Sequence, residues 1–121
     1  MSQGYPRIRR ITHRSEFQRL LSKGTRVRTS DLDVRELASP LGYVRVGLVV
    51  PKIGQTAVAR NTLKRRLREL VRLHLLPLPA SCDVAIRCQK SAYRRNFQTL
   101  QEQVARIGAG LVTQFGKAAE A

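Results

Sequence analysis

The stretch YVRVGLVVPKIGQTAVARNTLKRRLRELVRLHLLPLP, residues 43–79, decides the fold. Its first part, residues 43–51, is rich in β-branched residues and mostly apolar, and it ends at Pro51, which cannot donate to a strand ladder. This part predicts a central strand. From Ala57 to about Leu75 apolar residues recur at helical spacing until two prolines end the pattern, which predicts a long helix.

The segments on either side predict further elements. We expect helices over residues 15–23 and 97–115, an extended segment over residues 26–37 and a strand over residues 83–87. Ser15 and Gln18 stand at capping-box spacing in the first helix, and Asn96 is placed to cap the last one. The predicted class is therefore α/β: a single-domain sandwich of a small mixed sheet and three helices, in the order helix, strand, strand, an optional third strand, helix, strand, helix.

The charge of the chain indicates a polyanionic partner. Its 121 residues carry 23 Lys and Arg against 8 Asp and Glu, a formal net charge of +15. Nucleic acid accounts for this excess better than an anionic membrane surface does. No segment is long and apolar enough to span a membrane, and we identify no secretory signal. We expect one cytoplasmic, RNA-binding domain over residues 1–121, with flexible ends at about residues 1–7 and 116–121.

Few side chains suggest chemistry of their own. Cys82 and Cys88 would lie about 20 Å apart on one strand, too far for a disulfide, so we expect buried thiols. The two histidines lack further zinc ligands at suitable spacing, and His74 lies on the apolar side of its helix. Asp31 and Asp33 are predicted to be solvated neighbours on one strand face. We therefore expect neither a catalytic residue nor a metal site in this chain.

The long predicted helix separates apolar from cationic side chains. At about 100° per residue, Leu63, Leu67, Leu70 and Val71 share one face, while one flank gathers most of the cations. Residues 60–72 contain six Lys or Arg and one acid, Glu69. Like charges four positions apart, such as Arg60 and Lys64, repel each other. A bound phosphate backbone would turn that repulsion into attraction, so the helix is a candidate nucleic-acid surface.

The string RVGLVVPKIGQTAVARNTLKRRLRELVR, residues 45–72, resembles the signature of the protein subunit of bacterial ribonuclease P. The family's Arg-Asn, Lys-Arg and Arg-Glu pairs are matched by Arg60-Asn61, Lys64-Arg65 and Arg68-Glu69. The opening RRITHRSEFQRLLSKGTRVR, which includes Phe17 and Gly24, is also similar to that family. The resemblance covers roughly residues 8–105.

This resemblance implies a ribonucleoprotein endonuclease whose catalytic centre lies in its RNA. The chain would help that RNA to remove the 5′ leader from precursor tRNA, with Mg²⁺ held mainly by the RNA and the substrate, and with no obligate protein partner. A left-handed βαβ crossover is implied as well, an exception to the usual handedness. The implied contacts with the catalytic RNA are Arg60, Asn61, Lys64, Arg65 and Arg68. The leader would lie between the long helix and the exposed sheet face, near Phe17, Leu32, Val34, Arg45 and Lys52.

Two segments depart from the family pattern. Residues 51–53 read PKI where Ser-Lys-Lys is common, so one cation is missing. In SDLDVREL, residues 30–37, the aromatic residues that the family often has in this strand are absent. We therefore expect weaker stacking on leader bases, with Arg35 as the candidate to substitute as a cationic plane.

Two other functions remain open. A structural RNA-binding protein, for example a ribosomal component, would suit the charge and the small α/β fold almost equally well. A metal nuclease acting alone would cleave RNA without an RNA partner, but such enzymes normally show more convergent carboxylates than these eight acids offer.

Overall fold

The computed structural model describes residues 6–52 and 54–117. In chain order the elements are η1 (Arg7–Arg9), α1 (Arg14–Lys23), β1 (Thr25–Arg28), β2 (Leu32–Ala38), β3 (Val44–Val49), α2 (Ala57–His74), β4 (Cys82–Cys88), η2 (Lys90–Arg94) and α3 (Phe97–Phe115), where η marks a 3₁₀ helix. This order confirms the predicted class, with the optional third strand present. Of the ends expected to be flexible, residues 1–5 and 118–121 lie outside the described residues. Within the described part, Arg7 begins η1 and Gly116 bridges to Ala80.

The four strands form one mixed sheet in the order β1-β2-β4-β3. Strand β2 pairs antiparallel with both β1 and β4, whereas β3 and β4 are parallel. A parallel pair needs a crossover connection, and α2 provides it. The left-handedness of this crossover stays a prediction.

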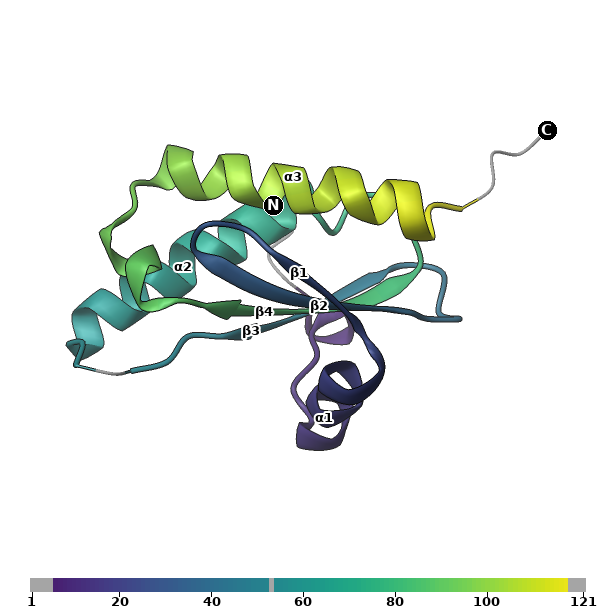
Figure 1. Cartoon of the computed structure of the whole chain (residues 1–121), viewed down its shortest axis with the longest axis horizontal. Helices are drawn as coiled ribbons and strands as arrows, with labels where there is room; N and C mark the ends of the chain where they lie inside the picture. The colour runs from purple at the N-terminus through teal and green to yellow at the C-terminus, as the bar shows by residue number, and fades with distance from the viewer. Residues whose placement is uncertain (1–5, 53, 118–121) are drawn as a thin grey trace.

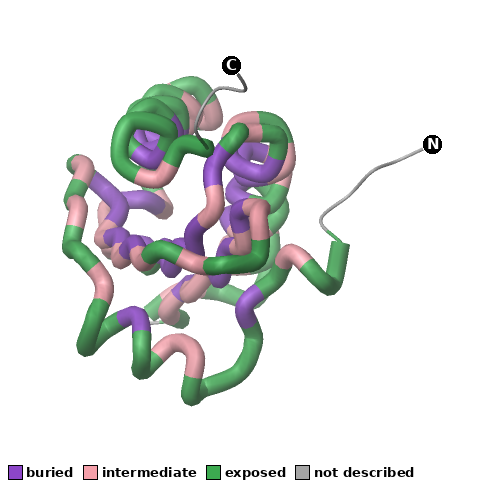
Figure 2. The backbone as a smooth tube through the Cα atoms, turned by 90° about the vertical axis from the view of Figure 1, so that its right-hand side faces the viewer, coloured by how far each residue is buried: buried purple, intermediate pink, exposed green. Residues whose placement is uncertain are grey.

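The helices divide between the two faces of the sheet (Figure 1). Helices α2 and α3 cover one face, and α1 lies against the other. Alternate side chains of β2, β3 and β4 point into the layer under α2 and α3, where most of the buried residues lie (Figure 2). The core of the domain therefore lies on one side of the sheet, and the α1 side is only partly covered.

This arrangement corrects the expected role of two strand residues. Leu32 and Val34 have no exposed surface and belong to the core cluster under α2 and α3. Their neighbours Asp33 and Arg35 lie on the opposite, α1-covered face, because successive strand residues alternate. Leu32 and Val34 therefore cannot contact a leader, and the sheet face beside α2 is not exposed.

A small second cluster attaches α1 to the sheet. Ile11, Leu20 and Ala85 are buried there, and the Phe17 ring packs against them. Gly47 makes room for this ring, since a Cβ at that position would come within 2.8 Å of Phe17 Cε1. Phe17 is thus half-buried, with its remaining surface available on the α1 side of the sheet.

The expectation of solvated carboxylates is wrong for Asp31, which is fully buried. Its carboxylate accepts hydrogen bonds from Arg95 Nε at 2.9 Å and Gln103 Nε2 at 2.6 Å, and also from Ser91 Oγ. These partners come from η2, α3 and the segment between them, 60 to 72 residues away in sequence. Asp31 therefore ties the turn between β1 and β2 to the last helix, and the extended segment expected over residues 26–37 is divided there into two strands.

The N-terminal caps position α2 and α3. The Thr56 hydroxyl accepts from Ala59 N at 3.0 Å, and Asn96 Oδ1 accepts from Thr99 N at 2.8 Å, which confirms the predicted Asn96 cap. The expected capping box of the first helix is wrong, because α1 begins at Arg14 with His13 as its N-cap, and Ser15 lies inside the helix.

Both cysteines are free and buried, as expected. Burial, together with the nearby carboxylates, raises the pKa of each thiol to about 12. Neither thiol is a nucleophile near neutral pH, because the reactive form is the thiolate.

Candidate nucleic-acid interface

Helix α2 presents a row of cations at its surface. Arg60, Lys64 and Arg68 follow one another at four-residue spacing, while Leu63, Leu67, Leu70 and Val71 anchor the opposite side of the helix in the core. Partial burial lowers the pKa of Lys64, and the positive charges of Arg60, Arg68 and Lys52 lower it further. The cations are therefore crowded in the folded chain, and a bound anion would favour their charged forms.

The row begins at a hollow around the N-terminus of α2. This hollow, of about 350 Å³, is lined by Lys52, Gln55, Thr56, Ala57, Arg60 and Asn61. Arg60 is held in place by a 2.9 Å hydrogen bond from its Nε to the carbonyl oxygen of Val50. Lys52, expected near the leader, lies instead with the residues expected to contact the catalytic RNA. Its side chain is exposed in the loop before α2.

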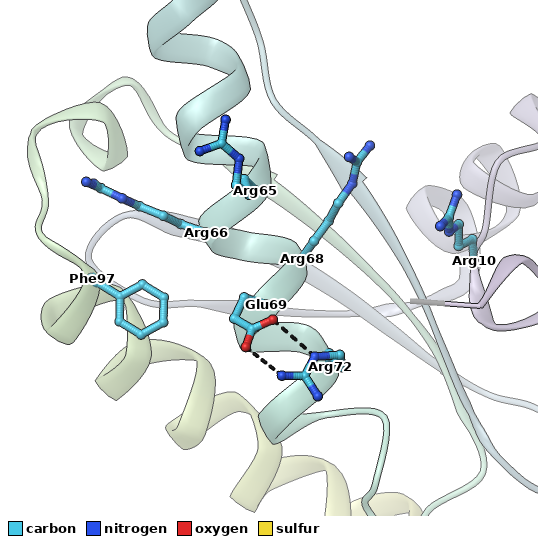
Figure 3. A pocket seen from close by; sticks show the side chains of 7 residues that line it. All are labelled: Arg10, Arg65, Arg66, Arg68, Glu69, Arg72 and Phe97. Atoms are coloured by element: carbon cyan, nitrogen blue, oxygen red, sulfur yellow. Dashed lines mark hydrogen bonds and ion pairs between the residues drawn. The ribbon is translucent and has the colours of Figure 1, made fainter. Parts of the chain in front are cut away.

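A larger hollow, of about 450 Å³, lies further along the same helix (Figure 3). Its lining consists of Arg10, Arg65, Arg66, Arg68, Glu69, Arg72 and Phe97. Arg72 donates to Glu69 from Nε at 3.1 Å and from Nη2 at 2.5 Å, so the one acid in this lining is already paired. Arg65, Arg66 and Arg68 make no hydrogen bond or ion pair within residues 6–52 and 54–117, which leaves their donors available for a ligand.

Arg45, expected near the leader, is engaged within the protein. It donates to Asp83 through Nε at 2.9 Å and Nη2 at 2.7 Å, and Nη2 also lies 3.0 Å from Glu16 Oε2. The hydrogen bonds to Asp83, against the effect of partial burial, raise the pKa of Arg45 above its ordinary value. Because Glu16 belongs to α1, Arg45 fixes this helix on the sheet, and we leave it out of the leader site.

A third hollow, of about 170 Å³, lies between α1 and the sheet. It is lined by Phe17, Leu21, Asp33, Arg35, Val49, Ala85 and Arg87. Arg35 donates from Nη1 to the Leu21 carbonyl at 3.1 Å, whereas its buried Nε has no hydrogen-bond partner among the described residues. A buried donor without an acceptor is unfavourable.

The sequence-based reasoning missed Arg87, Val49 and Leu21 in this hollow. A signal for Arg87 was present, because it alternates with the buried Ile86 and Cys88 and must point to the other face of the sheet. The sequence contains no comparable signal that the open face of the sheet is the one on the α1 side, because the open face depends on where α1 packs.

Neither a metal centre nor a membrane span is found in the described part of the chain. No three His, Cys, Asp or Glu side chains converge there in a way that could hold a metal ion. Likewise, none of the helices in that part is long and apolar enough to cross a bilayer.

Comparison of the sequence with known proteins gives matches to ribonuclease P proteins. The Ribonuclease P family matches residues 5–111 of the chain. A ribonuclease P protein component from Pseudanabaena is 32% identical over 104 residues, covering 84% of this chain and 90% of that protein. A second one, from Syntrophobacter fumaroxidans, is 45% identical over 65 residues, covering 54% of this chain and 55% of that protein.

The fold is also found among solved structures. The RNase P protein of Staphylococcus aureus matches with a TM-score of 0.73 and 27% sequence identity, covering 85% of this chain and 96% of that one. The strand order and the three helices described above thus occur in a known protein of this kind.

Proposed function

This chain belongs to the ribonuclease P family as its protein component, and from that premise we propose that it binds a catalytic RNA through α2 and the 5′ leader of precursor tRNA through the hollow beneath α1. The observation that carries this proposal is the cationic row of α2, in which Arg60, Lys64 and Arg68 lie beside one another on a helix anchored in the core. Phosphates that bind there relieve the repulsion between these charges.

The α2 surface is assigned to the catalytic RNA because its cations extend along the whole helix. Structured RNA offers phosphates at regular spacing, and arginine binds them through two parallel hydrogen bonds. Five residues of α2 carry this role: Arg60, Asn61, Lys64, Arg65 and Arg68. Lys52 joins them, since it lies in the same hollow as Arg60 and Asn61.

The hollow beneath α1 is assigned to the leader because it combines an aromatic ring with two arginines. Phe17 offers a stacking surface, and Arg35 and Arg87 add positive charge. Single-stranded RNA is bound by such combinations of aromatic rings and cations.

Replacing Phe17 with leucine is expected to weaken binding of leader-bearing precursor tRNA to the holoenzyme by roughly 10-fold, because one base loses its stacking partner. Leucine keeps most of the contact with Ile11 and Leu20. The measurement is the dissociation constant for precursor tRNA and for the same tRNA without a leader. Gly47→Ala, which displaces the Phe17 ring, should have a similar effect. An equal loss for both tRNAs would contradict the leader assignment.

The proposed function is tested by reconstitution. At low magnesium concentration, cleavage of precursor tRNA by the cognate ribonuclease P RNA should become faster when this protein is added. The protein without RNA should not cleave, since the described part of the chain has no group of three His, Cys, Asp or Glu side chains that could hold a metal ion. An unchanged cleavage rate on addition of the protein would contradict the proposal.

Magnesium is assigned to the RNAs rather than to this chain. The acids that the structure describes are largely engaged elsewhere: Asp31 with Arg95, Asp33 with Arg26, and Asp83 with Arg45. When bound, magnesium supplies activation of the attacking water and stabilisation of the leaving oxygen. The protein residues contribute by neutralising the phosphates around it.

We further propose that the chain acts in the cytoplasm and needs no obligate protein partner.

A generic structural RNA-binding role, as in a ribosomal component, makes a different prediction for α2. If the protein recognises one RNA, the double variant Arg60→Ala, Arg68→Ala should lose much more affinity for the ribonuclease P RNA than for other structured RNAs. An equal loss on every structured RNA would favour the generic role.

A further inference from the structure

An aromatic ring, that of Phe97, lines the hollow of about 450 Å³ on α2. Phosphate binding by the cationic row gives this ring no role. Phe97, the first residue of α3, packs partly against the core and lines this hollow with its remaining surface. Arg66 lies outside the cationic row and extends on the same side of α2 as Phe97, while Arg68 points toward Arg10 (Figure 3). The hollow thus joins an arginine cluster to an aromatic surface.

The charge of this hollow suits a phosphate-bearing ligand. Five of its seven lining residues are arginines, and its one acid, Glu69, is paired with Arg72. Arginine guanidinium groups bind phosphate through paired hydrogen bonds and also stack on bases. The volume falls within the range of about 300–1,000 Å³ that small-ligand sites occupy.

We propose that this hollow binds an unpaired nucleotide of the catalytic RNA, with its base stacked on Phe97 and its flanking phosphates held by Arg65 and Arg66. This inference rests on the proposed function, because it extends the α2 surface toward α3. The leader is not the occupant, since its hollow lies on the opposite face of the sheet, beneath α1. The hollow shares Arg65 and Arg68 with the surface assigned to the catalytic RNA, so one RNA can occupy both.

The test uses the full-length protein and the cognate ribonuclease P RNA. Phe97→Leu removes the stacking ring and should weaken binding by roughly 10-fold. Phe115→Leu is the matched control, because Phe115 is also half-buried against the core but lies at the other end of α3, about 27 Å away along the helix. Arg66→Gln, a surface change that leaves the core intact, should weaken binding several-fold, whereas Arg106→Gln on the exposed side of α3 should not.

A spectroscopic variant reports the stacking directly. The chain has no tryptophan, so a Phe97→Trp protein carries a single indole at the proposed site. The fluorescence of this indole should be quenched when the RNA binds. The Phe115→Trp protein should show no comparable quenching.

Two results would overturn the inference, and they are distinguishable. In the first, the Phe97→Leu and Arg66→Gln proteins bind the RNA like their controls and the Phe97→Trp protein is not quenched, while changes at Lys64, Arg65 and Arg68 still weaken binding. The nucleotide site is then wrong and the proposed function stands. If the wild-type protein does not bind the ribonuclease P RNA, both are wrong.

Discussion

Replacing Lys64, Arg65 and Arg68 together with glutamine is expected to weaken binding to the ribonuclease P RNA by roughly 100-fold, since each side chain loses a charge-assisted contact with phosphate. These side chains point away from the core, whereas Leu63 and Leu67 on the other side of the helix are unchanged. The substitutions also remove like charges that repel within the free protein. The thermal stability of the triple variant should therefore equal or exceed that of the wild type.

The measurement is the dissociation constant as a function of salt concentration. If about six cations contact phosphates, the wild type should show a slope of log affinity against log salt of roughly −4 to −5, a loss of several hundredfold between about 50 and 200 mM. Removing three of these contacts should reduce the magnitude of the slope by about 2 to 3. A slope near zero for the wild type would contradict the electrostatic role of α2.

A second triple variant separates local charge from total charge. Arg28, Arg106 and Lys117 are exposed cations on β1, on α3 and after α3, none of them in the three hollows described above. Replacing these three with glutamine changes the net charge equally and should weaken binding by less than about 10-fold. Equal losses for the two triple variants would mean that overall charge, not the α2 surface, determines affinity.

Replacing Asp31 with alanine is expected to lower the free energy of unfolding by about 3 kcal/mol, because a fully buried acceptor of several hydrogen bonds is lost. Gln103, itself buried, is left with an unsatisfied Nε2 donor, whereas the partly exposed Arg95 can turn to water. The measurement is chemical denaturation near neutral pH. A loss below about 1 kcal/mol would mean that this buried network contributes little to stability.

The same carboxylate should make stability depend on pH. Burial opposes its ionisation, but the hydrogen bonds from Ser91, Gln103 and Arg95 together with the charge of Arg95 outweigh this effect, so the pKa of Asp31 lies below its ordinary value. Its contribution is then fully present above the unfolded-state pKa of about 3.9 and is lost as the pH falls toward the folded-state value. The difference in unfolding free energy between wild type and Asp31→Asn should therefore shrink between about pH 5 and pH 3.

Asp33→Ala and Asp33→Asn are the matched controls for the two experiments. Asp33 pairs with Arg26 at 3.0 Å, but the Arg26 side chain is 47% exposed, so this ion pair should contribute much less to stability than the Asp31 network. If Asp33→Asn and Asp31→Asn have the same effect, burial of Asp31 is not what makes its network stabilising.

Local sequence periodicity was sufficient to predict the three α-helices, the strands β3 and β4, and the division of α2 into an apolar and a cationic side, but not the turn that divides residues 26–37 into β1 and β2. These features depend on residues within a few positions of each other, as with Asn96 and the Thr99 amide that it caps. The same locality explains why Arg60, Lys64 and Arg68 could be named together, since one turn of helix brings them onto one row.

Which surface of the sheet remains open depends on the packing of the whole chain. Alternation along β2 shows that Leu32 and Asp33 face opposite ways, but it does not tell which face the helices cover. That depends on contacts between distant segments: α3 against β2, Arg45 of β3 with Glu16 of α1, and Asp31 with Gln103. Because such contacts form only when the whole chain packs, local patterns are enough for the cationic helix, whereas only the packed fold forms the hollow between α1 and the sheet and brings Phe97 and Arg66 into one hollow.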